Sequence, residues 1–223
     1  MHAAVVTSFD SPPTYLEHPD PVAHGVDEAV VDVLAAGLHP RVRSQANGSH
    51  YTSAGELPLV PGIDAVVRDP EGRIRYAVLD ETTLGTMADR TVIDLDRSVV
   101  LSNGIDPVQV AAAMNPAMSA WVALRRRIDF RRRQRVLILG ATGNAGRMAI
   151  QVAKRFGAAH VIAAGRDQAR LAELGALGAD ETCTFDELAI AADVDVVIDY
   201  VWGEPTARAI VDMLTLAPTA ARR

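Results

Sequence analysis

The stretch RVLILGATGNAGRMAIQVAKRFGA, residues 135–158, decides the fold of the second half of the chain. It starts as an apolar run typical of a buried strand, has glycines at 140, 143 and 146, and continues with the periodicity of an amphipathic helix. Glycine permits a tight turn, lets backbone N–H groups approach a phosphate, and allows a helix to pack closely on a strand. The positive dipole end of the helix also attracts anions. The stretch therefore predicts a loop that holds the pyrophosphate of a dinucleotide.

The spacing of these glycines departs from the usual dinucleotide motif. That motif is Gly-x-Gly-x-x-Gly, and Ala141 takes the place of its first glycine. The alternative is an ordinary strand–helix turn that is rich in glycine. The context of strand, loop and helix favours the binding loop. The cofactor contacts expected in it are Thr142, Gly143, Asn144, Ala145 and Gly146.

The end of the next expected strand, HVIAAG at residues 160–165, indicates which cofactor binds. An acidic residue there holds the ribose 2′-hydroxyl of NAD, whereas an arginine suits the 2′-phosphate of NADP. Gly165 is followed by Arg166, and Arg170 lies one helical turn further. Asp167 either binds the ribose or caps the following helix, and capping is the favoured role. We expect NADPH, bound in part by Gly165, Arg166 and Arg170.

The rest of the second half alternates expected strands with expected helices. The strands are residues 135–140, 160–165, 181–185 and 194–201, and each is followed by a helical segment. Apolar strands that alternate with helices form a parallel sheet covered on both faces. Ahead of them, the Ala-rich segment from residue 106 predicts a helix that Pro116 either splits into two or kinks.

The first hundred residues have a different pattern, with short apolar runs between clusters of Pro, Gly and Asp. We expect strands at residues 3–6, 28–38, 64–69, 74–80 and 89–94. The sequence DPEG, residues 69–72, predicts a tight turn between two of them, with Pro at its second position and Gly at its fourth. This half is therefore expected to be a compact β-rich module, barrel-like or sandwich-like.

The composition excludes several classes of protein. The chain has 223 residues, a net charge of −6 and one cysteine, which leaves no intrachain disulfide framework and no Cys-rich zinc site. The N-terminus lacks a signal-peptide pattern, and no 18-residue window is apolar and uncharged, so we expect a soluble cytoplasmic protein without a membrane partner.

A basic run, RRRIDFRRRQR at residues 125–135, raises the question of nucleic-acid binding. Basic residues with one aromatic among them can contact nucleic acid or an acidic partner. The other interpretation is a solvated helix end, whose arginines suit the negative end of the helix dipole. The overall acidity of the chain favours the second interpretation, so no nucleic-acid partner is expected.

With both halves assigned, the chain resembles the zinc-free quinone oxidoreductases of the medium-chain dehydrogenase/reductase superfamily. The segments that carry the resemblance are MHAAVVTSFDSPPTYLEHPDPV, VDVLAAGLHPRVRSQANGSHYTSAGELPLVPGID, GTMADRTVID, AAAMNPAMSAW and LGATGNAGRMAIQVAKRFGA. The resemblance implies an α/β protein: a GroES-like β-barrel domain over residues 1–122, and an incomplete Rossmann domain over residues 123–223 that lacks the family's last two strands. It also implies NADPH in the cleft between the domains.

The resemblance further implies a reaction and a set of site residues. Zinc-dependent members have a Cys and a Gly-His-Glu in places that hold Leu38-His39-Pro40 and Pro61-Gly62-Ile63-Asp64 here, so no metal is expected. Hydride transfer to a quinone or an activated alkene or carbonyl, a small-molecule substrate, needs no metal. Tyr51 and His39 are the candidate catalytic residues. Each could donate a hydrogen bond or a proton to the substrate, and the alternative for each is a purely structural role. Asn115 and Ser119 are the candidates beside the nicotinamide.

The resemblance also has consequences for the end of the chain. Without the family's last two strands, the fourth strand of the second sheet is expected to be a bare edge, which invites pairing with another copy of the chain. The nicotinamide side of the site is then half built, and activity is expected to be reduced. The alternative function is that of a catalytically inactive NADP-binding or interaction protein.

Overall fold

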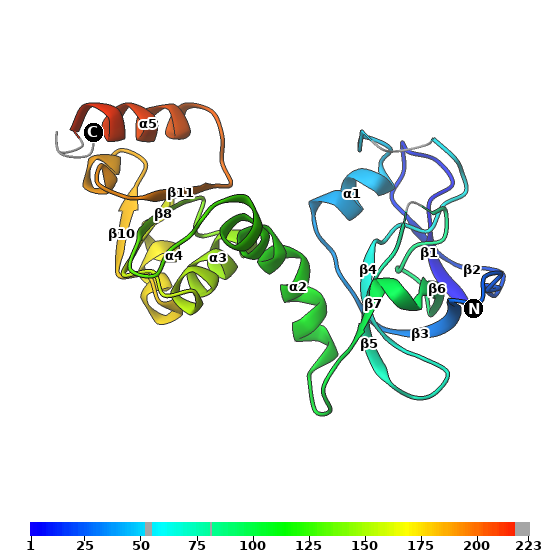
Figure 1. Cartoon of the computed structure of the whole chain (residues 1–223). Helices are drawn as coiled ribbons and strands as arrows, with labels where there is room; N and C mark the ends of the chain where they lie inside the picture. Colours follow the sequence, from blue (N-terminus) through cyan, green and yellow to red (C-terminus); the bar gives the residue numbers. More distant parts are fainter. Residues whose placement is uncertain (52–54, 81, 217–223) are drawn as a thin grey trace. The chain divides into compact units, whose positions relative to one another are not determined.

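The computed structural model of the chain describes residues 1–51, 55–80 and 82–216 (Figure 1). The backbone contacts divide it into two compact units, Met1–Asn115 and Pro116–Arg223. The division falls within helix α2 (Pro107–Val122), and the predicted domain boundary, between residues 122 and 123, lies at the end of that helix. Where an independently folding domain begins stays a prediction. No helix of the described residues is long and apolar enough to cross a membrane.

The first unit is built on an antiparallel sheet of five strands (Figure 1). Its order is β6 (Arg90–Asp94), β3 (Glu28–Ala36), β4 (Asp64–Arg68), β5 (Ile74–Val78) and β7 (Ser98–Val100). Strands β1 (His2–Val5) and β2 (Thr14–Glu17) form a separate antiparallel pair. The sheet curls into a half-barrel, so the predicted barrel-like β module is confirmed.

Three short elements of this unit were not predicted from the sequence. All four residues of β2, TYLE, are exposed, so this strand has no alternation of apolar and polar residues. Strand β7 has only three residues, and Val99 and Val100 are exposed. Helix α1 (Pro40–Ala46) has seven residues, of which only Val42 is buried. Such elements are stabilised by the structure around them, and they give no local periodic signal.

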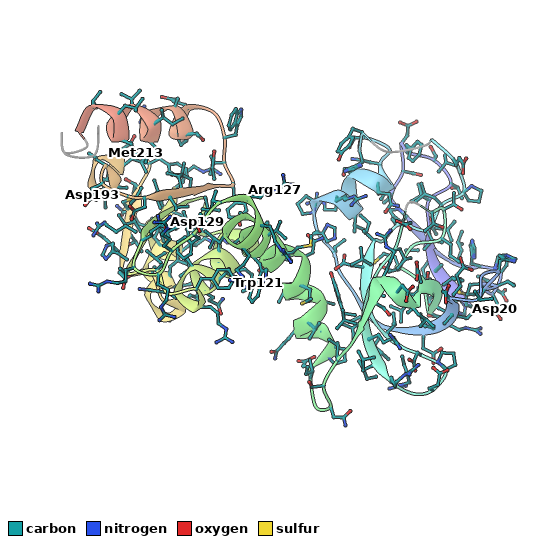
Figure 2. The ribbon with its side chains drawn as sticks, in the orientation of Figure 1. Asp20, Trp121, Arg127, Asp129, Asp193 and Met213 are labelled. Carbon is teal, nitrogen blue, oxygen red and sulfur yellow. The ribbon has the colours of Figure 1, made fainter. Side chains whose placement is uncertain are left out.

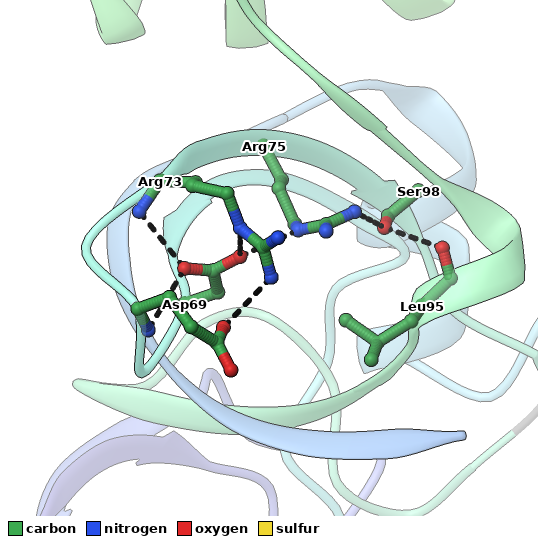
Figure 3. Close-up of polar contacts among 6 residues, drawn as sticks. Asp69, Arg73, Arg75, Leu95 and Ser98 are labelled. Atoms are coloured by element: carbon green, nitrogen blue, oxygen red, sulfur yellow. Dashed lines mark hydrogen bonds and ion pairs between the residues drawn. The ribbon is translucent and has the colours of Figure 1, made fainter.

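The predicted turn at residues 69–72 joins β4 and β5, and a buried carboxylate holds it (Figure 3). Oδ1 of Asp69 accepts hydrogen bonds from the backbone N–H groups of Glu71, at 3.1 Å, and Arg73, at 2.8 Å. Its Oδ2 accepts from Nε of Arg73, at 2.7 Å, and Nε of Arg75, at 2.8 Å. Arg75 also donates to Oγ of Ser98 at 2.9 Å, which ties the turn to β7.

The second unit is a parallel sheet of four strands in the order β10 (Glu181–Thr184), β9 (His160–Gly165), β8 (Arg135–Leu139) and β11 (Val196–Asp199). In chain order this is 3-2-1-4, the expected beginning of a Rossmann sheet. Helix α3 (Asn144–Arg155) packs on one face, and α5 (Glu204–Leu216) on the other. Shorter turns of helix connect the strands: α4 (Gln168–Ala172), η3 (Leu174–Leu177) and η4 (Leu188–Ala191). The α/β fold class is therefore confirmed.

Helix α2 (Pro107–Val122) runs through Pro116 as one helix, so of the two outcomes expected there, the split into two helices is wrong. Proline removes only one backbone donor, and the residues on either side supply enough helical hydrogen bonds for the helix to continue. It is followed by a π-helical turn, Ala123–Arg127. The Oγ of Ser119 donates to the carbonyl oxygen of Pro116 at 2.9 Å.

The basic run at residues 125–135 lies along this turn and the loop before β8; Arg127 and Asp129 mark it in Figure 2. The guanidinium of Arg125 lies over the ring of Phe156, 5.6 Å from its centre. The backbone N–H of Arg133 donates to the carbonyl oxygen of Gly157 at 2.7 Å. Both contacts attach the run to the end of α3, as expected for a structural helix end, and binding of nucleic acid stays untested.

Candidate functional site

The three glycines of the loop between β8 and α3 have different structural roles. Gly140 has a φ of +80°, a left-handed conformation that favours glycine. A side chain at Gly146 would place its Cβ 2.4 Å from the carbonyl oxygen of Gly140, so only glycine lets the helix pack this close to the loop. Gly143 precedes the first residue of α3 as its N-cap and is exposed. The loop therefore presents its backbone and the N-terminus of a 12-residue helix without covering side chains.

A cleft of about 930 Å³ opens over this loop, a size typical of small-molecule sites. Five of the predicted cofactor contacts line it, namely Thr142, Gly143, Gly165, Arg166 and Arg170, and they are joined by Phe185, Tyr200, Val201 and Pro205. Asn144, Ala145 and Gly146 follow Gly143 directly as the first turn of α3. A second hollow of about 580 Å³ shares Arg166, Phe185 and Pro205 with the cleft.

The end of β9 supplies the charged side of the cleft. Asp167 is the N-cap of α4, and its Oδ1 accepts a hydrogen bond from the backbone N–H of Arg170 at 3.2 Å. This confirms capping as a role of Asp167. Nη2 of Arg170 donates to the carbonyl oxygen of Thr142 at 2.8 Å, which braces the glycine loop. Arg166 is exposed and forms no ion pair with another described residue, so its five donors are available to an anion.

A pair of hydroxyl groups lies where β11 ends. The hydroxyl of Tyr200, which lines the cleft, is 2.9 Å from Oγ of Ser119 on α2. Burial raises the pKa of Tyr200, so its hydroxyl stays protonated at neutral pH. The second predicted residue of α2, Asn115, is half-buried and is the last residue of the first unit.

In the first unit, a buried carboxylate holds the predicted residue His39. Asp64 is fully buried, and its Oδ1 accepts a hydrogen bond from Nε2 of His39 at 2.8 Å. The hydroxyl of Tyr76 donates to Oδ2 of Asp64, also at 2.8 Å. Burial and the charge of Asp64 raise the pKa of Tyr76 well above its ordinary value. The arrangement fixes the imidazole of His39 through one nitrogen and leaves Nδ1 as its second polar atom.

Tyr51, the other candidate catalytic residue, is on the surface. Its side chain is 93% exposed, and its ring lies 4.5 Å from that of His50. Among residues 1–51, 55–80 and 82–216, no group of three or more His, Cys, Asp or Glu side chains is placed to hold a metal ion.

Several residues at these sites were not predicted. Phe185 and Tyr200 each stand directly after a strand, at the carboxyl edge of the sheet where ligands bind, and this position is a signal that the sequence offered. From the sequence, Asp64 is only the first residue of an expected strand and the last of Pro61-Gly62-Ile63-Asp64, with no role of its own. Its place directly before the buried run Ala65-Val66-Val67 is a sign that it needs polar partners.

The comparisons with known proteins agree with this geometry. No protein-family model matches the chain. It is 32% identical over 248 residues to a probable NADPH-dependent quinone reductase, tdiC, of Emericella nidulans, covering 93% of this chain and 70% of that protein. It is 28% identical over 170 residues to the chloroplastic NADPH-dependent alkenal/one oxidoreductase of Arabidopsis thaliana, covering 69% of this chain and 44% of that protein. The quinone oxidoreductase of Thermus thermophilus, solved also in complex with NADPH, superimposes with a TM-score of 0.84 at 29% identity, over 95% of this chain and 70% of that one.

Proposed function

The chain belongs to the quinone oxidoreductases of the medium-chain dehydrogenase/reductase superfamily, and on this basis we propose that it reduces a quinone or an activated alkene or carbonyl with NADPH. The observation that carries the proposal is the position of Arg166. It follows the second strand of the sheet, borders both the cleft over the glycine loop and the second hollow, and has no ion-pair partner among the described residues. An arginine in that place suits the 2′-phosphate that distinguishes NADPH from NADH.

The residues of the cleft fit a dinucleotide phosphate. The N-terminus of α3, with its positive dipole end, lies beside the cleft, and the close contact at Gly146 keeps this turn free of bulk. The N–H of Gly143 itself donates to the carbonyl oxygen of Gly140 at 3.1 Å and shapes the loop. Arg170 holds the loop through Thr142 and adds positive charge beside Arg166. Tyr200 and Ser119 would place two hydroxyl groups on the β11 side of the cofactor.

Bound NADPH supplies the hydride. One hydride and one proton together convert a quinone to a hydroquinone, so the protein must provide a proton source. We assign this role to His39 in its imidazolium form, in which both ring nitrogens carry a proton. Its Nδ1–H would donate to the substrate oxygen and leave a neutral ring, while Asp64 accepts from Nε2–H and holds the ring in place. Tyr51 is the second candidate donor, because its hydroxyl is on the surface and is not committed to a buried partner.

We propose that the reaction needs no metal. The places at which zinc-dependent members of the superfamily have a Cys and a Gly-His-Glu hold Leu38-His39-Pro40 and Pro61-Gly62-Ile63-Asp64 here, and the imidazole of His39 is bound to Asp64. Cytoplasmic location, the absence of a nucleic-acid partner, and self-association through the edge of β11 stay predictions. Within the described part of the chain, β11 pairs with β8 alone.

The test is NADPH oxidation with quinones and enones after treatment with a chelator. Turnover that survives removal of metal supports the proposal. Turnover that is lost with the chelator and restored only by added zinc contradicts the proposal that the reaction needs no metal. Binding of NADPH without turnover on any quinone or enone would favour the alternative, a catalytically inactive NADP-binding protein.

A further inference from the structure

A strained tryptophan stands at the end of β11. Trp202 has a φ of +59°, in the left-handed region that bulky residues rarely adopt. Its side chain is 81% exposed, so burial of the indole does not offset the strain. Gly203, the next residue, also has a positive φ, of +78°. Glycine at position 202 would have the same backbone without the strain, and the presence of tryptophan therefore needs another explanation.

The neighbouring residues hold this conformation firmly. Oδ1 of Asp199 accepts hydrogen bonds from the backbone N–H groups of Val201, at 2.8 Å, and Trp202, at 3.1 Å. Its Oδ2 accepts from Oγ1 of Thr206 at 2.7 Å, which ties the turn to the first turns of α5. The strained residue is thus fixed on both sides, by β11 and by the helix that follows.

The turn lies against the glycine loop. A side chain added at Gly140 would come within 2.9 Å of Cγ2 of Val201, so Val201 and the glycine are in close contact. Tyr200 and Val201 on one side of Trp202 line the cleft, and so does Pro205 on the other side. Trp202 is the exposed aromatic residue in the middle of this segment, and its indole is not itself among the side chains that line the cleft in the free chain.

We propose that Trp202 is a binding residue for the dinucleotide, and that its indole stacks on a planar ring of the bound cofactor. This rests on the proposed function, because it takes the cleft to be the NADPH site. Offset stacking of aromatic rings is favourable and directional. If the indole of Trp202 makes its stacking contact only when the cofactor is bound, it is exposed in the free chain, and the strained turn serves to hold it ready.

The first test is the fluorescence of Trp202 alone. The chain has two tryptophans. One of them, Trp121, is labelled in Figure 2. It packs edge-on against Phe156, with 4.7 Å between ring centres. Trp121→Phe keeps an aromatic ring there and leaves Trp202 as the only tryptophan, which can be excited at wavelengths that the four tyrosines do not absorb. NADP⁺ is the probe, because the oxidised cofactor does not absorb tryptophan emission. Saturable quenching is expected; binding of NADP⁺ by calorimetry with unchanged Trp202 emission would overturn the inference and leave the proposed function intact.

The second test separates a binding role from a structural one. Trp202→Gly is expected to raise the melting temperature of the free chain by about 2–4 °C, because it removes the strain. The same variant is expected to weaken NADP⁺ binding by about two- to tenfold. A variant that melts lower, or that binds NADP⁺ as tightly as the parent chain, overturns the inference. No binding of NADP⁺ by the parent chain overturns both this inference and the proposed function.

Discussion

Nε2 of His39 lies 2.8 Å from Oδ1 of Asp64, a carboxylate that is fully buried in the first unit. The other oxygen of Asp64 accepts from the hydroxyl of Tyr76. A buried carboxylate is tolerated only when its oxygens are hydrogen-bonded, and these two donors meet that need. The same contact fixes the ring of His39, so the residue that we propose as proton donor also meets a structural requirement.

His39→Leu is expected to lower kcat about 100-fold, the order of effect of one general acid. The affinity for NADPH, measured by calorimetry, is expected to stay the same, because the expected cofactor contacts of the glycine loop and Arg166 belong to the second unit. His24→Leu replaces an exposed histidine of the same unit and serves as the control. An unchanged kcat in the folded His39 variant would assign the proton to another donor, such as Tyr51.

Gly146→Ala is expected to destabilise the second unit by about 1–3 kcal/mol, because the new Cβ meets the backbone of Gly140 and Ala141. Both tryptophans belong to this unit, so urea unfolding followed by their fluorescence reports on it directly. Gly175→Ala is the matched control, since a Cβ at Gly175 meets no atom within 4 Å. Equal stability of the two variants would contradict the close packing described for the loop.

The turn at Asp69 predicts a dependence of stability on pH. Burial alone would raise the pKa of Asp69, but hydrogen bonds from Arg75 and Arg73 outweigh it and hold the pKa at about 2, below the ordinary 3.8. Because the folded pKa is the lower one, the stabilisation is complete above about pH 4 and is lost as the pH falls through about 2.

Asp69→Asn is therefore expected to lower the free energy of unfolding near pH 7 by on the order of 1–2 kcal/mol, and the difference from the parent chain should shrink toward pH 2. Urea unfolding followed by circular dichroism at several pH values measures this. Glu71→Gln removes an exposed partner of Arg73 and should change stability by less than about 0.5 kcal/mol. A difference between Asp69→Asn and the parent chain that does not vary with pH would contradict the account.

Arg166→Ala is expected to weaken NADPH binding about 10- to 100-fold, because charge-assisted contacts to the 2′-phosphate are lost, and to change NADH binding much less. Arg131→Ala, which removes an exposed arginine paired with Asp129, is the control for net charge. Calorimetric titration with NADPH and with NADH gives, for each nucleotide, the ratio of the variant's dissociation constant to that of the parent chain. Equal losses for NADPH and NADH would reject the contact of Arg166 with the 2′-phosphate.

Much of the second unit could be predicted from the sequence, because three of its strands, β8, β9 and β11, are short apolar runs and helical segments follow them. The glycine loop and the cap at Asp167 follow from local patterns, whereas the order 3-2-1-4 follows from the resemblance to a Rossmann fold. The continuation of α2 through Pro116 could not be predicted, since one proline removes too little to decide whether a helix ends.

The pairs of residues that build the sites were harder to predict, because they join distant parts of the chain. Asp64 meets His39 across 25 residues, and Ser119 meets Tyr200 across 81. No local period encodes such contacts. They follow from the register of strands and from the way the helices pack on the sheet.

The central claim, that this cleft binds NADPH in preference to NADH, is tested most directly by melting the unmodified chain with each nucleotide. A ligand that binds the folded state adds RT ln(1 + [L]/Kd) to its stability, about 2.7 kcal/mol at a hundred times Kd. We predict that NADPH raises the melting temperature at concentrations at which NADH has little effect. No shift with NADPH, or an equal shift with NADH at the same concentration, would contradict the claim.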